Sequence, residues 1–360
     1  MELKRKNILI VSPEPWEHIF VSKHHYATHL ALRGNNIVFL NPPSEKFSIK
    51  ETEYQNLKVC DYKGFWKGLR LYPKTIRAIN QRKVLSAIER ISKLKFDIIW
   101  SFDNSVFFDF DALPQPIFKI SHIVDLNQDF QTKNAAKSAD VCIGVTREIV
   151  KRLKYYNPNS HFINHGLNVA ITRDIPVDLP GDNKTKVLYV GNLAMKYLDW
   201  HTLYLSIKMY PESDFIFIGP NADDCNLTTN ETHQFKKLCS SCTNVYFLKP
   251  IKSEEIQSYL NAGDVLIICY QEKYHSYQAN AHKILEYLYS GKPVLASYSS
   301  AYEGLDLLYM GKKNESMVYS LGDIVADLKA FNTKDDVNRR KEFALENTYE
   351  KQIQRIEKLI

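Results

Sequence analysis

The chain has 360 residues, of which 44% are hydrophobic and 24% are charged, and its formal net charge is +6. This is an ordinary soluble composition, and the length exceeds what one hydrophobic core usually serves, so we expect two domains. The opening residues, MELKRKNILIVSPEP, hold too short an apolar run for a signal peptide, and no other run has spanning length, so we expect a cytoplasmic protein.

Short apolar runs separated by stretches of helical spacing fill the first half. They are NILIVSP (7–13), NNIVFLNPP (35–43), FDIIWSF (96–102), IFKISHIVDL (117–126), DVCIGV (140–145) and HFINHG (161–166). Most are continuous rather than alternating, which is typical of strands covered on both faces of a parallel sheet. Residues 1–167 are therefore predicted to form a doubly wound, Rossmann-like domain.

Residues 58–95 interrupt this pattern with eleven Lys or Arg against only Asp61 and Glu89. Aromatic and aliphatic residues stand near the start of the stretch. A basic segment of this kind binds either nucleic acid or an anionic membrane surface. No zinc-finger, RNA-recognition or helix-turn-helix signature is present, so we favour the membrane. The alternative is a solvated helix with a basic face.

The polar stretch 168–186 contains Pro176, Pro180 and Gly181 without periodicity, and it is predicted to be a linker. A second domain is expected over 187–345, followed by a C-terminal helix, 346–360, that crosses back to the first domain. Its strands are predicted at KVLYVGNL (186–193), DFIFIGP (214–220), NVYFLKP (244–250), DVLIICY (264–270) and KPVLAS (292–297).

The predicted fold class is thus α/β, with two tandem doubly wound parallel-sheet domains facing across a cleft. Ligands of such sheets bind at the carboxyl ends of the strands, where helix N-termini favour an anionic ligand such as a nucleotide diphosphate. The chain has no G-x-G-x-x-G fingerprint, Walker loop or G-x-S-x-G elbow, which disfavours hydride transfer, P-loop and hydrolase chemistry.

Residues 186–300 resemble the nucleotide-sugar-binding domain of GT-B glycosyltransferases of the family 4 type (glycosyl transferases group 1). The resemblance rests on VLYVGNL with a following Lys, DFIFIGP, VYFLKP, GDVLIICY and KILEYLYSGKPVLAS, in that order and spacing. HFINHGLNVAI is similar to the family's segment entering the linker, and EFALENTYEKQIQRIEKLI to its final helix. The first half matches only in its strand pattern and in ISHIVDL.

The resemblance implies that Glu286 binds the ribose hydroxyls of the donor nucleotide. An ionised carboxylate is suited to this because it accepts two hydrogen bonds from a vicinal diol. The helix carrying Glu286 is expected to begin near Gln278 or Ala279 and to end at Gly291, with Pro293 preventing its continuation. Its N-terminal N–H groups would then hold the pyrophosphate, and the small Ala279 and Ala281 would allow close approach.

Two departures from the family pattern affect the phosphate and sugar contacts. The family's Gly-Arg reads Gly191-Asn192 here, with Lys196 retained, and Lys283 is the candidate for the missing cation. The family's acidic residue eight positions before Glu286 is the neutral Gln278, which we expect to face an N-acetylated or acidic sugar. The other donor-site positions implied by the resemblance are Pro250, Tyr270, Asn280 and His282.

The resemblance also makes His122 a candidate contact to the donor sugar, with a core histidine as the alternative. Asp109 and Asp111 in FFDFD resemble a metal-binding Asp-X-Asp, but they lie in the half expected to bind the acceptor, so no metal site is predicted. CSSC at 239–242 lacks the second cysteine pair usual in structural zinc sites.

Together these residues predict a glycosyltransferase using a UDP- or GDP-linked sugar and a glycan or lipid-linked glycan acceptor, with no other cofactor and no nucleic-acid partner. Retention of configuration and metal independence are implied by the resemblance. His122, Lys196 and Gln278 are the predicted catalytic residues. The alternatives are a nucleotide-sugar epimerase of the same architecture and a catalytically inactive nucleotide-sugar-binding protein.

Overall fold

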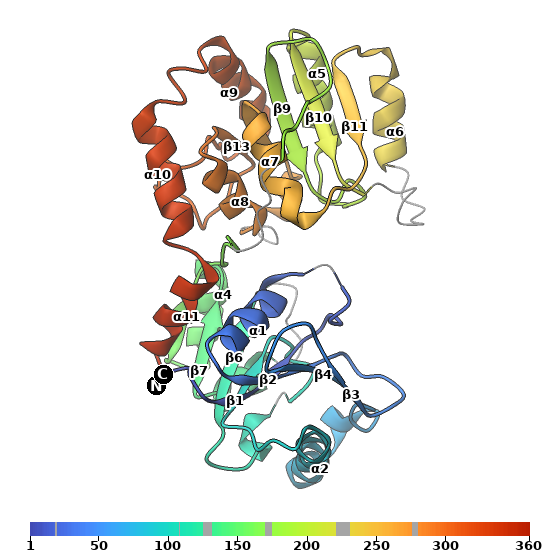
Figure 1. Ribbon diagram of the computed structural model, residues 1–360, viewed down its shortest axis with the longest axis vertical. Helices are drawn as coiled ribbons and strands as arrows, with labels where there is room; N and C mark the ends of the chain where they lie inside the picture. Colours follow the sequence, from blue (N-terminus) through green and yellow to red (C-terminus); the bar gives the residue numbers. More distant parts are fainter. Residues whose placement is uncertain (19, 108, 125–131, 170–174, 221–230, 276–279) are drawn as a thin grey trace. The chain divides into compact units, whose positions relative to one another are not determined.

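The computed structural model describes residues 1–360 except 19, 108, 125–131, 170–174, 221–230 and 276–279, with only the backbone described at 232 and 233. The chain divides into two compact units (Figure 1). Unit 1 comprises Met1–Gly166 and Tyr349–Ile360, and unit 2 comprises Leu167–Thr348. Each unit is built around a predominantly parallel sheet. Among the described residues, no helix is both long and apolar enough to cross a membrane.

The sheet of unit 1 has eight strands within the described residues, in the order β3-β4-β2-β1-β5-β6-β7-β8. β3 runs antiparallel to β4, and the other neighbouring pairs are parallel. The strands are β1 (Asn7–Val11), β2 (Asn36–Leu40), β3 (Ser48–Glu51), β4 (Leu57–Asp61), β5 (Ile98–Ser101), β6 (Phe118–Ile123), β7 (Val141–Gly144) and β8 (Ser160–Phe162).

Each predicted run of the first half contains one strand, but β3 and β4 were not predicted. β3 is the sequence SIKE, whose side chains are partly or fully exposed, so it carries no apolar run. β4, LKVCD, buries Leu57, Val59 and Cys60 yet lies at the start of the basic stretch. The interpretation of 58–95 as one basic segment was therefore wrong over 58–61, which belong to the sheet.

The helices of unit 1 cover both faces of this sheet (Figure 1). Buried residues of α1 and α11 form a core with one face, and buried residues of α2, α3 and α4 form a core with the other. The bounds are α1 (Ser22–Leu32), α2 (Lys74–Ser92), α3 (Thr132–Ser138), α4 (Arg147–Lys154) and α11 (Tyr349–Glu357), with short 3₁₀ turns η1 (Leu69–Leu71) and η2 (Phe110–Ala112).

The C-terminal helix α11 is part of the core of unit 1. Tyr349 is 1% exposed, and its ring lies so close to Gly166 that a Cβ there would stand 2.4 Å from ring atoms. Gln352 donates to the carbonyl of His165 at 2.9 Å. Arg33 of α1 pairs with Glu350 and Glu357. Helix α11 thus completes a hydrophobic core with residues of unit 1 that lie more than 180 positions away in the sequence.

The sheet of unit 2 has five parallel strands within the described residues, in the order β11-β10-β9-β12-β13. Each predicted run of the second half contains one of them. The strands are β9 (Thr185–Val190), β10 (Ser213–Ile218), β11 (Val245–Leu248), β12 (Val265–Ile268) and β13 (Val294–Ala296). β9 begins at Thr185, one residue before the predicted strand and within the predicted linker.

Two groups of helices flank this sheet (Figure 1). α5 packs beside α6 and α9, while α8 packs beside α7 and α10. The helices are α5 (Trp200–Met209), α6 (Glu231–Leu238), α7 (Ile256–Ala262), α8 (Lys283–Ser290), α9 (Glu315–Ala326) and α10 (Lys334–Leu345), with 3₁₀ turns η3 (Cys239–Ser241), η4 (Ser253–Glu255) and η5 (Glu272–Tyr274). Because all five strands are parallel, the loops after them gather at one edge of the sheet.

Candidate active site

Helix α8 carries the predicted ribose-binding residue to the carboxyl edge of unit 2. It begins at Lys283, so the expected start near Gln278 or Ala279 was wrong; both of those residues lie outside the described part of the chain. Residues 280–282 precede the helix as a turn, and no side-chain cap fixes its start. The expected end is confirmed, because Gly291 adopts φ +79° and its N–H bonds the carbonyl of Leu288.

Glu286 is a carboxylate on an otherwise buried face. Its neighbours Leu285 and Tyr287 are fully buried, whereas Glu286 itself is partly exposed. Its carboxylate makes no hydrogen bond or ion pair with any described residue. Burial raises its pKa, and the charge of Lys283 acts in the opposite direction. An unpaired carboxylate of this kind can accept hydrogen bonds from a ligand without first losing a protein partner.

Lys283 points back toward the end of β9, one helical turn from Glu286. Its Nζ donates to Tyr189 Oη at 3.0 Å and to the carbonyl of Val190 at 3.2 Å, and it lies 4.3 Å from the Tyr189 ring centroid. A Cβ at residue 191 would stand 2.1 Å from this ammonium, and the backbone φ of +157° also favours glycine, so Gly191 allows Lys283 to lie here. The structure thus brings Gly191 and Lys283 together at the end of β9, and Tyr270 also hydrogen-bonds Lys283 there.

The loop after β9 presents the second predicted cation. Lys196 is exposed, and its only described side-chain contact is with the ring of the adjacent Tyr197, 5.3 Å away. Asn192 accepts a hydrogen bond from the N–H of Ala194 at 2.8 Å, which folds the loop between them. Gly219, at the end of β10, is needed because a Cβ there would stand 2.0 Å from the carbonyl oxygen of Gly191.

The remaining predicted donor-site residues divide into buried and accessible ones. Tyr270 is 3% exposed and lies behind this surface; burial raises its pKa to about 12, and the charge of Lys283 partly offsets the rise. Asn280 is 9% exposed, whereas Ala281 and His282 are partly exposed immediately before α8. Pro250 is exposed after β11. Backbone and accessible side-chain groups at this edge are therefore supplied by Ala281 and His282 rather than by Tyr270.

His122 lies in the aromatic core of unit 1. It is 1% exposed and stacks on Phe102 with ring centroids 4.6 Å apart. Its Nδ1 accepts a hydrogen bond from Trp100 Nε1 at 3.3 Å. Burial lowers its pKa to about 3, which keeps the ring neutral near pH 7. This placement favours the alternative of a core histidine, and a contact with donor sugar stays a prediction.

The carboxylates of FFDFD face cations of α2 instead of a common point. Asp109 pairs with Arg77 at 3.4 Å, and Asp111 pairs with Lys74 at 3.2 Å. In the CSSC segment, Cys239 and Cys242 are free thiols. Within the described part of the chain, no three His, Cys, Asp or Glu side chains gather closely enough to hold a metal ion.

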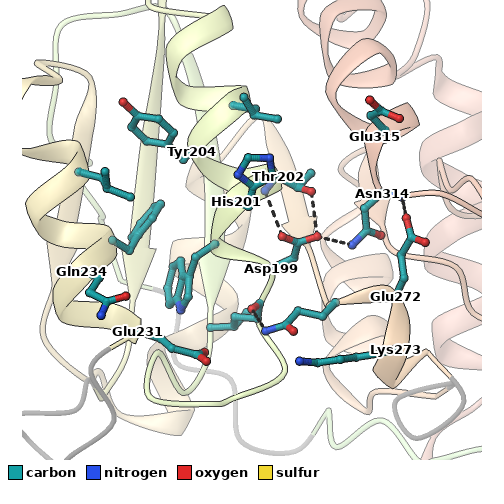
Figure 2. Close-up of a pocket in the computed structure, with 16 residues that line it drawn as sticks. Asp199, His201, Thr202, Tyr204, Glu231, Gln234, Glu272, Lys273, Asn314 and Glu315 are labelled. Carbon is teal, nitrogen blue, oxygen red and sulfur yellow. Dashed lines mark hydrogen bonds between the residues drawn. The ribbon is translucent and has the colours of Figure 1, made fainter.

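A pocket that the sequence did not indicate lies elsewhere in unit 2, between α5, α6, η5 and the start of α9 (Figure 2). Its volume is about 670 Å³, and none of the predicted site residues lines it. Its lining includes Asp199, Gln271 and Asn314. Gln271 Nε2 donates to the carbonyls of Lys196 and Leu198 at 3.2 and 3.0 Å, so the pocket wall also holds the loop that presents Lys196.

Asn314 connects three loops of the carboxyl edge. Its Nδ2 donates to Asp199 Oδ2 and to the carbonyl of Tyr270, both at 2.7 Å, and its Oδ1 accepts from Ser297 Oγ at 3.0 Å (Figure 2 shows the Asp199 contact). Its backbone N–H donates to Glu272 at 3.0 Å. These bonds join the segments that follow β9, β12 and β13. No local sequence signal points to Asn314, because its partners are up to 115 residues away.

Neither models of protein families nor the curated proteins gave a match to this chain. Among solved structures, the sucrose-phosphate synthase of Thermosynechococcus elongatus matches with a TM-score of 0.74 and 14% identity over 99% of this chain and 98% of that one. Anabaena HepE in complex with UDP and glucose matches with a TM-score of 0.68 and 14% identity over 98% of both chains. Trehalose-6-phosphate synthase OtsA matches with a TM-score of 0.67 and 10% identity, again over 98% of both.

At these identities the likeness establishes the fold alone. It spans nearly the whole of each chain, so it includes both units and the C-terminal helix. The two Rossmann-like sheets predicted from the sequence are confirmed. The chain has the GT-B fold that these glycosyltransferases share.

Proposed function

We propose that this protein is a glycosyltransferase that moves a sugar from a nucleotide-sugar donor to a glycan or lipid-linked glycan acceptor in the synthesis of a surface polysaccharide. The observation that carries the proposal is the carboxylate of Glu286, one helical turn from Lys283 at the carboxyl edge of unit 2, which has no hydrogen-bond or ion-pair partner in the part of the chain that the structure describes. The fold supports it, because HepE, which is structurally similar, binds UDP and glucose.

In this proposal Glu286 accepts hydrogen bonds from the two ribose hydroxyls of the donor. The N–H groups at the start of α8 face the diphosphate, since a helix N-terminus favours negative charge. Lys283 is held by Tyr189 and the carbonyl of Val190, and its ammonium supplies positive charge for the phosphate oxygens. UDP is the first nucleotide to test, because it is present in the HepE complex.

The chemical step is assigned to charge stabilisation. As the bond from the sugar to the diphosphate breaks, negative charge grows on the leaving oxygen, and Lys196 approaches it from the loop after β9. We propose retention of configuration and metal independence on the strength of the family resemblance. A donor phosphate oxygen then takes the acceptor proton, so no separate general base is required.

The class of acceptor also determines where in the cell the reaction takes place. A lipid-linked acceptor is reached at the inner face of the plasma membrane, so we propose a cytoplasmic protein attached peripherally to that face. Residues 58–95 are the candidate contact.

The first experiment is a thermal-shift screen with UDP, GDP, dTDP and CMP on the wild type, Glu286→Ala and Glu315→Ala. A ligand that binds only the folded protein stabilises it, by about 2.7 kcal/mol when its concentration is 100 times Kd. Glu315 is the matched control, because it is an exposed glutamate in the first turn of α9. We expect one nucleotide to stabilise the wild type and the control but not Glu286→Ala.

The second experiment separates a transferase from its alternatives. The protein is incubated with the sugar derivative of the selected nucleotide and no acceptor, and products are followed by proton NMR. Slow hydrolysis supports a transferase, conversion to an epimeric nucleotide sugar supports an epimerase, and an unchanged donor supports a binding protein. The proposal fails outright if no nucleotide stabilises the wild type in the first screen.

A further inference from the structure

Large apolar side chains are concentrated on the outside of unit 1 between β4 and α2. Trp66 is 51% exposed, Leu71 83%, Tyr72 42% and Ile79 64%. These are four of the fourteen exposed large apolar side chains in the described part of the chain, and they fall within fourteen residues. Single exposed apolar residues are normal, but a cluster of them marks a surface that contacts something other than water.

Three of these residues lie in the segment just before α2, and the fourth, Ile79, lies in the second turn of α2 itself. The Trp66 and Tyr72 rings lie 6.3 Å apart, edge to face. The N–H of Trp66 donates to Asn80 Oδ1 at 3.4 Å, which places Trp66 next to the turn of α2 that carries Ile79. Leu71 ends η1, immediately before Tyr72.

Positive charge surrounds this surface. Lys63, Lys67 and Lys83 are exposed and make no ion pair with any described residue. The exposed face of α2 continues with Arg82 and Arg90 at helical spacing. The nearby acids Asp109 and Asp111 are paired with Arg77 and Lys74, so they do not neutralise the three lysines.

We propose that Trp66, Leu71, Tyr72 and Ile79, with Lys63, Lys67 and Lys83, form a basic apolar patch that docks unit 1 on an anionic lipid bilayer. Trp and Tyr favour the headgroup region, exposed aliphatic side chains gain by entering the acyl boundary, and lysines are attracted to anionic lipids. A nucleic-acid backbone would satisfy the lysines but would not cover Leu71 and Ile79. Docking would bring the enzyme to a lipid-linked acceptor, and this role of the patch rests on the proposed function. The binding of the patch to vesicles does not depend on that function.

The test is flotation of the full chain with vesicles of phosphatidylcholine alone or mixed with phosphatidylglycerol, at low and at high salt. We expect binding only to the mixed vesicles and only at low salt, because salt screens the attraction. The triple variant Lys63→Gln, Lys67→Gln, Lys83→Gln should reduce the partition coefficient by about fivefold per lysine. The double variant Leu71→Ser, Ile79→Ser should also reduce the partition coefficient, although it leaves the net charge of the protein unchanged.

Helix α4 supplies a matched control on the same unit. Lys151, Lys154 and Tyr155 are all exposed there, with Tyr155 at 84%. The variant Lys151→Gln, Lys154→Gln, Tyr155→Ser removes comparable groups and should bind vesicles like the wild type. Trp66 adds a direct signal, because Trp16 and Trp100 are buried and the half-buried Trp200 lies in unit 2, stacked on Phe235. The emission of Trp66 should shift to the blue on binding, and Trp66→Phe should abolish the shift.

The proposal is overturned if the wild type does not bind mixed vesicles at low salt. It is also overturned if the α4 control variant loses as much vesicle binding as the triple lysine variant. Binding to an oligonucleotide, but not to vesicles, through the same lysines would assign the surface to nucleic acid instead. Calorimetric titration with UDP on each variant keeps the two proposals separate. A patch variant that no longer binds vesicles but still binds UDP shows that the patch acts independently of the nucleotide site. A wild type that binds vesicles but no nucleotide contradicts the proposed function and leaves the lipid-docking proposal intact.

Discussion

At the scale of single residues, the proposed role of Glu286 predicts how nucleotide binding responds to pH. Burial raises the pKa of this carboxyl above its ordinary value of 4.5. Only the ionised form can accept both ribose hydrogen bonds. Nucleotide affinity should therefore be constant well above that raised pKa and should fall as the pH drops through it.

The variant Glu286→Gln removes the titrating group but keeps its size. We expect it to bind UDP about 1.5–3 kcal/mol more weakly than the wild type at neutral pH, the range for hydrogen bonds to a charged group. Calorimetric titrations between pH 5 and 8 measure both proteins. Because titration of UDP itself affects the two equally, the difference between them isolates Glu286. An affinity difference that does not shrink toward low pH would contradict the assignment.

Lys196 is exposed and forms no ion pair with any described residue, which suits a group that acts on charge appearing during the reaction. Lys196→Ala should lower kcat more than it raises KM, because negative charge on the leaving diphosphate is largest in the transition state. Steady-state kinetics with the donor selected by the nucleotide screen measures both. A raised KM with unchanged kcat would make Lys196 a ground-state contact. Lys208→Ala, on the exposed end of α5, is the control.

At the scale of elements, Asn314 ties together the segments after β9, β12 and β13. Asn314→Ala removes the hydrogen bonds to Asp199, Tyr270 and Ser297, although each of these groups keeps at least one other hydrogen-bond partner. We expect a loss of about 1–3 kcal/mol in the free energy of unfolding. Thermal melts followed by circular dichroism measure it. Glu315→Gln, the exposed neighbour, should melt like the wild type, and equal stability of both variants would contradict the role given to Asn314.

At the scale of the whole molecule, the two units have separate cores, and α11 belongs to the core of unit 1. Tyr349→Ala should destabilise unit 1 by about 3–5 kcal/mol, the range for deleting a large buried aromatic side chain. Nucleotide binding, assigned to unit 2, should persist wherever the variant stays folded. Denaturant unfolding and UDP titration of one sample test both statements. Loss of UDP affinity in a folded Tyr349→Ala variant would contradict the assignment to unit 2 alone.

The sequence by itself determined the strands with continuous apolar runs and the end of α8. Buried parallel strands such as β9 and β12 are apolar throughout, so composition reveals them without tertiary information. Gly291 followed by Pro293 likewise stops a helix through local backbone geometry. The family resemblance, carried by local motifs, led to Glu286, Lys283 and Gly191. The structure brings Gly191 and Lys283 into contact and places Glu286 one helical turn away.

Only the tertiary structure decided the rest. β4 pairs with β2, and β3 pairs in turn with β4; β3 has no apolar run, and the short β4 is interrupted by Lys58 and adjoins the basic stretch. The start of α8 lacks a side-chain cap, so no local signal marks Lys283 as its first residue. His122 looks like a strand-end site residue in sequence, yet Trp100 and Phe102 enclose it. Asn314 acts through partners distant in sequence. In each case the deciding interactions are non-local, and a single sequence specifies such interactions only through the fold.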